Sequence, residues 1–101
     1  ITGGIKIDDP ALDLAVIFSI LSSNTNLSIE NGLCFCAEVG LSGELRNVKN
    51  IDIRISEAER LGYNKIIISS NSKTQNKTNQ IEILKFSNLS DVVKEVFKEQ
   101  D

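Results

Sequence analysis

The sequence predicts an α+β domain in which helices pack on a mixed β-sheet, with the elements in the order β-α-β-β-α-β-β-α. Short apolar runs alternate with stretches of helical periodicity, which is typical of helices layered on a sheet. Glycine, asparagine and aspartate separate these segments, as they do at turns and helix ends. The 101 residues are 41% hydrophobic and 25% charged, enough for one buried core. We therefore expect a single domain over residues 1–101.

The chain opens with a strand and a helix. Residues 1–7 alternate loosely around a glycine pair and predict a strand. Asp8-Asp9-Pro10 predicts a helix start, because a carboxylate caps free amides and proline tolerates the first turn. The helix that follows, to about residue 22, is apolar nearly all round, which predicts burial on more than one side. Either a sheet and a second helix cover it, or one side is a subunit interface.

A hairpin and a second helix follow. Residues 33–39 and 44–48 predict two strands joined by a tight turn with a glycine at each end. Asn50 or Asp52 is the expected cap of the next helix, and Gly62 is a typical residue to end it.

The last third of the chain alternates strands and a helix. Residues 65–69 contain three consecutive isoleucines and predict a buried strand, whereas residues 70–80 have no apolar member and predict a surface loop. Residues 81–86 predict another strand. Ser87 or Asn88 is the expected cap of the final helix, which carries one apolar stripe.

Few kinds of catalytic or metal site are compatible with this sequence. There is no histidine, which excludes histidine-dependent triads, and no glycine-rich phosphate-binding motif is present. Cys34 and Cys36 share one face of a predicted strand, and we interpret them as core residues, so no metal site is expected. A Ser–Lys dyad needs no histidine, but the spacing of Ser19, Ser42 and Lys49 is not distinctive.

Basic residues gather locally although the net charge is −3. Between residues 45 and 65 they outnumber the acidic residues by five to three, and we treat them as candidates for contact with DNA phosphates; they are Arg46, Lys49, Arg54, Arg60 and Lys65. Arg46 is the first candidate because it lies in the predicted hairpin. A solvated helix face and, for Arg46, an ion pair are the alternatives.

Three segments carry a resemblance to a known family. "GGIKIDDPALDLAVIFSILSS", "FCAEVGLSGELRNV" and "EAERLGYNKIIIS" resemble the C-terminal region of the bacterial RadA/Sms family of DNA repair proteins, over nearly the whole chain. That region is similar to the proteolytic domain of Lon proteases, a fold of the ribosomal protein domain-2-like superfamily. The resemblance implies that the chain is a partial Lon-like domain, truncated at its N-terminal side, from the C-terminal part of a longer protein.

The resemblance also implies that the peptidase site is degenerate. Where Lon proteases have their nucleophilic serine this sequence has Ala11, and their lysine falls on Asp52, or on Arg54 if the alignment slips by two. A methyl group cannot attack a carbonyl, and neither a carboxylate nor a guanidinium serves as a neutral amine base. Catalytic residues are therefore expected to be absent from this segment.

The family's known properties give the remaining expectations. The longer protein is expected to be a cytoplasmic, ATP-dependent repair enzyme that forms a homo-hexamer, binds single-stranded DNA and possesses ATP, magnesium and zinc sites upstream of this segment. A recombinase is a further expected partner, and a membrane is not. The segment itself is expected to be a non-catalytic scaffold without a cofactor. Two alternatives remain open: an active Ser–Lys peptidase, and an oligomerisation module with no role in DNA binding.

Overall fold

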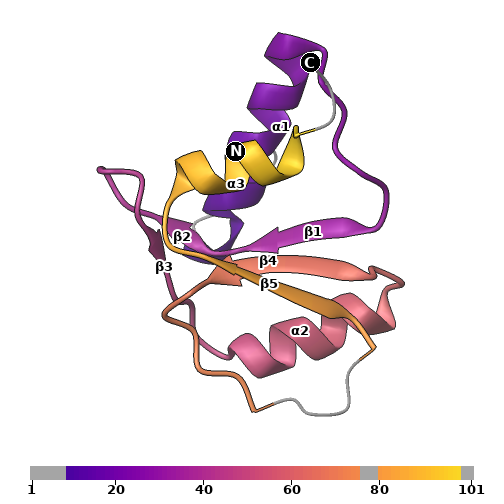
Figure 1. Ribbon diagram of the computed structural model, residues 1–101. Coiled ribbons are helices and arrows are strands. Elements are labelled where there is room, and N and C mark those ends of the chain that lie inside the picture. The colour runs from indigo at the N-terminus through magenta and orange to yellow at the C-terminus, as the bar shows by residue number, and fades with distance from the viewer. Residues whose placement is uncertain (1–8, 76–79, 99–101) are drawn as a thin grey trace, which may run out of the picture.

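The computed structural model describes residues 9–75 and 80–98. The predicted strand over residues 1–7 lies outside these residues. The elements, in chain order, are η1 (Pro10–Leu12), α1 (Asp13–Thr25), β1 (Leu33–Cys36), β2 (Glu38–Val39), β3 (Leu45–Arg46), α2 (Ile51–Arg60), β4 (Lys65–Ser69), β5 (Glu82–Phe86) and α3 (Leu89–Val96) (Figure 1).

The main sheet has three parallel strands in the order β1-β4-β5. Its central strand, β4, is the isoleucine run that the sequence predicted to be buried, and Ile66, Ile67 and Ile68 are at most 1% exposed. A parallel strand covered on both faces is expected to be continuously apolar. The α+β class is confirmed. Among the described residues the main sheet is parallel rather than mixed, and the antiparallel pairing lies in a separate two-stranded ribbon.

That ribbon arises because the predicted strand over residues 33–39 is interrupted. Ala37 is fully buried and its carbonyl accepts the Leu14 amide at 3.3 Å, so the chain leaves the main sheet at this point. Beyond it, β2 pairs antiparallel with β3, Glu38 lying opposite Arg46 and Val39 opposite Leu45. The predicted hairpin is therefore confirmed, with two short strands in place of the longer ones.

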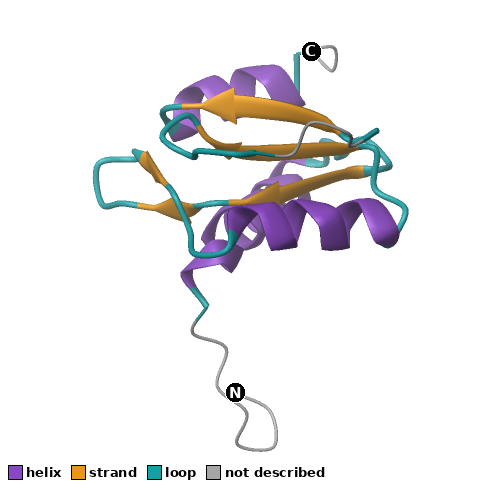
Figure 2. Cartoon of the chain, turned by 90° about the horizontal axis from the view of Figure 1, so that it is seen from below, coloured by secondary structure: helices purple, strands orange, loops and turns teal. Residues whose placement is uncertain are grey.

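Helices cover both faces of the main sheet, α1 and α3 on one side and α2 on the other (Figures 1 and 2). Alternate strand residues point to opposite faces, which divides the core in two. The α2 side is made of Ala11, Cys36, Val48, Ile51, Ile55, Ala58, Ile66, Ile68 and Ile81. The α1 and α3 side is made of Leu14, Phe18, Leu33, Ala37, Leu45, Ile67, Val92 and Phe97.

Most helix ends follow the local sequence, but Asn50, the expected cap of α2, has a left-handed φ of 60° and makes no side-chain capping hydrogen bond. Asp9 caps η1 and Asn88 caps α3, each by accepting a backbone amide two or three residues ahead. At the end of α2, Gly62 has a φ of +101°, and the amides of Gly62 and Tyr63 donate to the carbonyls of Glu59 and Ala58. This pattern of two reversed bonds around a left-handed residue is a Schellman motif, the reason a glycine ends the helix here.

Helix α1 differs from its prediction. Within α1 only Leu14 and Phe18 are fully buried, both against the sheet. Leu12, just before the helix, and Val16 and Ile20 within it are 40%, 53% and 54% exposed. Among residues 9–75 and 80–98 no second element covers that side, so the expectation of burial on more than one side is not met there. The alternative of a subunit interface remains.

Candidate functional site

The candidate site lies where η1, the start of α2 and the segment after β3 meet. Asp9 stands at its centre: its Oδ1 accepts the Ala11 amide at 3.0 Å, and its Oδ2 lies 3.0 Å from Nη1 of Arg54. The Ala11 amide first, and the Arg54 guanidinium next, hold the pKa of the Asp9 carboxyl below its ordinary value. Asp9 is thus held as an anion by a helix start and a cation together.

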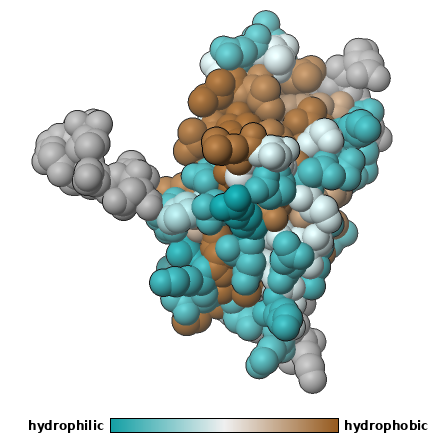
Figure 3. Space-filling view, turned by 90° about the vertical axis from the view of Figure 1, so that its left-hand side faces the viewer, coloured by the Kyte–Doolittle hydropathy of each residue, from teal (hydrophilic) through white to brown (hydrophobic). Residues whose placement is uncertain are grey.

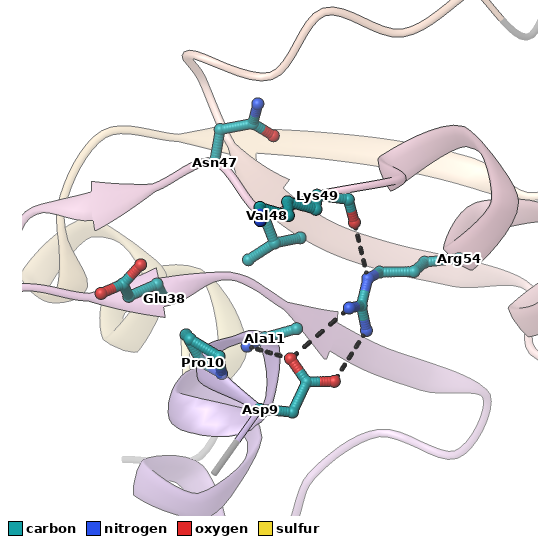
Figure 4. A pocket seen from close by; sticks show the side chains of 8 residues that line it. All are labelled: Asp9, Pro10, Ala11, Glu38, Asn47, Val48, Lys49 and Arg54. Carbon is teal, nitrogen blue, oxygen red and sulfur yellow. Dashed lines mark hydrogen bonds and ion pairs between the residues drawn. The ribbon is translucent and has the colours of Figure 1, made fainter.

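Arg54 joins this cluster from the first turn of α2. Its Nε donates to the Lys49 carbonyl at 2.8 Å, and its Nη atoms face Asp9 (Figure 4). The planar guanidinium suits such a bridge because its donors have a fixed geometry. Arg54 therefore fixes the turn before α2 against the turn before α1.

A pocket of about 350 Å³ opens beside this ion pair (Figure 4). Its lining mixes charged and apolar side chains: Asp9, Pro10, Ala11, Glu38, Asn47, Val48, Lys49 and Arg54. None of these residues carries a hydroxyl or a thiol, the groups that attack a carbonyl in covalent catalysis. The lining can therefore offer charge and hydrogen bonds to a ligand but no side-chain nucleophile of that kind.

The two predicted positions of the degenerate dyad fall in different places. Ala11 lines the pocket and is 2% exposed. The Asp52 carboxylate instead accepts the Gln75 amide, at 3.1 and 3.3 Å from its two oxygens, and Asp52 does not line the pocket. The α2 residue that lines the pocket together with Ala11 is Arg54, the position that the shifted alignment indicated.

The five basic candidates do not form one surface. Arg46, Lys49 and Arg54 lie near the carboxyl ends of the parallel strands, where the pocket is. Arg60 ends α2 and Lys65 begins β4, which places both at the opposite edge of the sheet. A crossover helix runs back along the sheet, so its two ends belong to opposite edges.

Four of the five candidates are engaged with carboxylates. Arg46 lies 2.7 Å from Glu44 and 4.0 Å from Glu38, and the pair with Glu44 raises the pKa of Arg46. Arg54 pairs with Asp9, as described, Arg60 with Glu57, and Lys65 with Glu30 at 2.9 Å. A phosphate would have to compete with these carboxylates for each cation.

Lys49 is the exception among the candidates. It is exposed, and within the described part of the chain it forms no ion pair. Its backbone carbonyl is held by Arg54, so its place on the rim of the pocket is defined while its ammonium group is available. Lys49 is therefore the candidate best placed for contact with an anion.

The sequence identified the basic candidates but not the carboxylates that pair with them. Glu57 precedes Arg60 by three residues on one helix, and Glu44 precedes Arg46 by two near one strand, so both pairs could have been found from spacing. Glu30 and Lys65 are brought together only by the pairing of β1 with β4. Asp9 and Arg54 likewise meet only through the fold.

The two cysteines belong to the core, as predicted. Cys36 is 8% exposed and Cys34 packs beside it against the α2 side. Burial raises the pKa of the Cys34 thiol to about 11 and also raises that of Cys36. In the described residues no group of three or more metal-ligating side chains is found. Nor do those residues include a helix of the length and apolarity that crossing a membrane requires.

Comparison with known proteins gives two results. The family model ChlI, described as subunit ChlI of Mg-chelatase, matches residues 2–72. Three relatives are each named DNA repair protein RadA. That of Streptococcus pneumoniae is 41% identical over 94% of this chain and 23% of its own length. That of Bacillus subtilis is 38% identical over 93% of this chain and 21% of its own length. That of Rickettsia conorii is 44% identical over 97% of this chain and 21% of its own length.

The chain therefore spans less than a quarter of the length of these relatives. The match to the family model runs from before η1 through β4, and so includes every residue that lines the pocket. Because that model matches more than half of the 101 residues, the chain belongs to the ChlI family.

Proposed function

We propose that this chain is a non-catalytic, Lon-like domain of a RadA-type DNA repair protein, where it holds subunits together and contacts DNA phosphates. The observation that carries the proposal is the pocket at Ala11, whose described lining has a methyl group at that position and neither a hydroxyl nor a thiol. The similarity to RadA proteins over more than nine-tenths of the chain supplies the biological context. In this proposal the protein is cytoplasmic, forms a hexamer, and has its ATP, magnesium and zinc sites outside this chain.

The proposed phosphate contact centres on Lys49. An ammonium group without a carboxylate partner attracts a phosphate without first breaking an ion pair, and each phosphate neutralised releases condensed counterions. Arg46 and Arg54 contribute to the same edge of the domain but are engaged with Glu44 and Asp9. Such contacts position DNA and do not read its sequence.

Lys49→Glu in the full-length protein that contains this domain tests the contact. Single-stranded DNA binding is measured by fluorescence anisotropy over a salt series, with Lys94→Glu on α3 as a control of equal charge change. We expect weaker binding and a salt slope shallower by about 0.7 for Lys49→Glu, the value for one phosphate on a single strand. Binding and slope equal to those of the control would remove Lys49 from the DNA surface and favour a purely oligomerising domain.

Incubation with an unfolded protein tests the absence of peptidase activity. We expect no cleavage, because Ala11 cannot form an acyl-enzyme. Turnover that is lost in Ser42→Ala would overturn the non-catalytic assignment, since Ser42 lies in the hairpin turn outside the pocket lining.

A further inference from the structure

A groove of about 640 Å³ runs between β2 and the outer side of α1, with the tip of the hairpin at its edge. This volume lies within the range of about 300–1,000 Å³ that is common for ligand sites. The lining of this α1 groove is mostly apolar, from Pro10, Leu12, Val16, Ile17, Val39 and Leu41. Apolar side chains gather in the upper half of Figure 3, on the side of the sheet where α1 and α3 lie.

Both walls of the α1 groove present aliphatic side chains to solvent. On the helix side, Leu12, Val16 and Ile20 are 40%, 53% and 54% exposed. They are spaced by four residues, so they form one stripe over about two helical turns, roughly 12 Å long. On the hairpin side, Leu41 is 108% exposed. A separate apolar segment of similar length could therefore contact both walls at once.

The backbone of β2 favours a helix over an added strand as that segment. β2 is only two residues long, and the Val39 amide already donates to Oδ2 of Asp13 at 3.2 Å. A strand that joins a sheet binds through main-chain hydrogen bonds, and this donor is not available to it. A helix binds instead through aliphatic side chains at positions i, i+3, i+4 and i+7, a length that matches the two-turn stripe.

Carboxylates supply the charge of the α1 groove. Asp9, Asp13 and Glu38 line it, and no lysine or arginine of the described residues does so. Asp9 is paired with Arg54, whereas Asp13 forms no ion pair within residues 9–75 and 80–98. An acidic side chain without a cation therefore lies beside the aliphatic stripe.

Neighbouring cations do not reverse this charge. Arg46 lies 2.7 Å from Glu44 and 4.0 Å from Glu38, so one guanidinium serves two carboxylates. Lys49 lines the adjoining pocket and not the groove. A segment that carries lysine or arginine would gain opposite charges at Asp13 and Glu38, whereas nucleic-acid phosphates and anionic lipid headgroups would be repelled there.

We propose that the α1 groove binds an amphipathic helix of another protein, one whose aliphatic face is flanked by lysine or arginine. Aliphatic side chains of that helix lie between Val16 and Leu41, and its cations face Asp13 and Glu38. This surface goes beyond the proposed function, because it requires neither DNA contact at Lys49 nor assembly of subunits.

A synthetic helical peptide tests the aliphatic contact. The probe is fluorescein-labelled and about four turns long, with leucine at the i, i+3, i+4 and i+7 positions of one face and lysine elsewhere. Its binding to the full-length protein that contains this domain is measured by fluorescence anisotropy. Val16→Ser removes an aliphatic side chain from the groove, and Ile53→Ser is its matched control, at a β-branched residue 69% exposed on α2 across the sheet. We expect about tenfold weaker binding for Val16→Ser and wild-type binding for Ile53→Ser.

Asp13→Asn tests the charge, because the asparagine side chain retains an oxygen for the Val39 amide. We expect the probe to bind this variant about threefold more weakly and with a shallower salt dependence. Asp91→Asn in the first turn of α3 is the control of equal charge change. A second probe, with glutamate in place of every lysine, is expected to show no measurable binding to the wild-type protein.

Several results would overturn the proposal. If the wild-type protein does not bind the lysine probe, another subunit or another segment of the chain fills the groove. Equal affinity of Val16→Ser and wild type would place the probe elsewhere, and if Val16→Ser also dissociates the subunits, the groove belongs to a second copy. Equal binding of the glutamate probe would remove the basic partner. Failure of the DNA contact is seen separately, because the titration of Lys49→Glu contains no peptide.

Discussion

Asp9 and Arg54 form an ion pair with 3.0 Å between Oδ2 and Nη1, although 45 positions separate them in the chain. The pair joins the cap of η1 to the first turn of α2, across the carboxyl edge of the parallel sheet. It also forms one wall of the Ala11 pocket. The geometry of the candidate site therefore depends on a contact between two helix starts.

This contact predicts a pH dependence of stability. The folded pKa of Asp9 lies below its ordinary value of 3.8, because the ionised carboxylate accepts the Ala11 amide and faces Arg54. The resulting stabilisation is present above about pH 4 and is lost as the pH falls through the lowered pKa. Asp9→Asn keeps an oxygen for the cap and removes the charge, so we expect a flatter decline of stability below about pH 4.

Urea unfolding at a series of pH values measures this difference. Asp91→Asn is a suitable comparison, because Asp91 also lies in the first turn of a helix but forms no ion pair within the described residues. Parallel decline of Asp9→Asn and wild type would contradict the assigned role.

Truncation of Phe18 tests the core on the α1 side. Phe18 is fully buried and its ring lies 4.8 Å from that of Phe35 and 5.7 Å from that of Phe97, centroid to centroid. Phe18→Ala is expected to lower the free energy of unfolding by about 3–5 kcal/mol, because it removes apolar burial and leaves a cavity. Val16→Ala, on the exposed side of α1, is expected to change it by less than about 0.5 kcal/mol. If urea unfolding shows equal losses of unfolding free energy for the two variants, the burial of Phe18 and the exposure of Val16 are both contradicted.

The two glycines of the hairpin turn are expected to respond differently to alanine. Gly43 has a φ of +82°, so Gly43→Ala forces a left-handed alanine at a cost of about 1 kcal/mol although the added methyl group has room. In Gly40→Ala the methyl group would clash with the Glu44 carboxylate, which is the far end of a flexible side chain and can move.

We therefore expect Gly40→Ala to change overall stability less than Gly43→Ala while releasing the Ser42 amide from Glu44. Thermal unfolding measures the first effect and amide hydrogen exchange at Ser42 the second. Unchanged protection of that amide in Gly40→Ala would show that Glu44 does not hold the turn.

The cysteines are expected to resist alkylation in the native protein. Burial raises the pKa of Cys34 from 9.0 to about 11, and this difference lowers the thiolate fraction near pH 8 roughly a hundredfold. Iodoacetamide labelling of Cys36→Ala, which leaves only Cys34, is expected to be slower in the folded than in the unfolded protein by at least that factor. Equal rates would mean that Cys34 is open to solvent.

Much of the local structure could be predicted from the sequence because its causes are local. Asp9 and Asn88 cap helices through amides two or three residues away, and Gly62 ends α2 through its own left-handed conformation. The isoleucine run in β4 could be recognised as buried because a strand covered on both faces has no polar positions. That Ala11 offers only a methyl group, and therefore no nucleophile, follows from its identity alone.

The sequence could not show where charged side chains meet. Five cations between residues 45 and 65 indicated one basic surface, yet the path of α2 along the sheet sends Arg60 and Lys65 to the edge opposite Lys49. Nor could it place Arg54 rather than Asp52 beside the pocket, because that depends on the rotation of α2 about its axis against the sheet.

The apolar pattern of α1 also separates what the sequence determines from what only the tertiary structure determines. Sequence by itself determined that the helix has more apolar surface than one sheet face can bury, since composition and periodicity are properties of the segment. Only the tertiary structure decided which residues remain uncovered, because burial depends on which other segments pack there. Leu14 and Phe18 pack against the sheet, whereas no element of the described residues covers Val16 and Ile20, and the hairpin places Leu41 in the same groove as Val16.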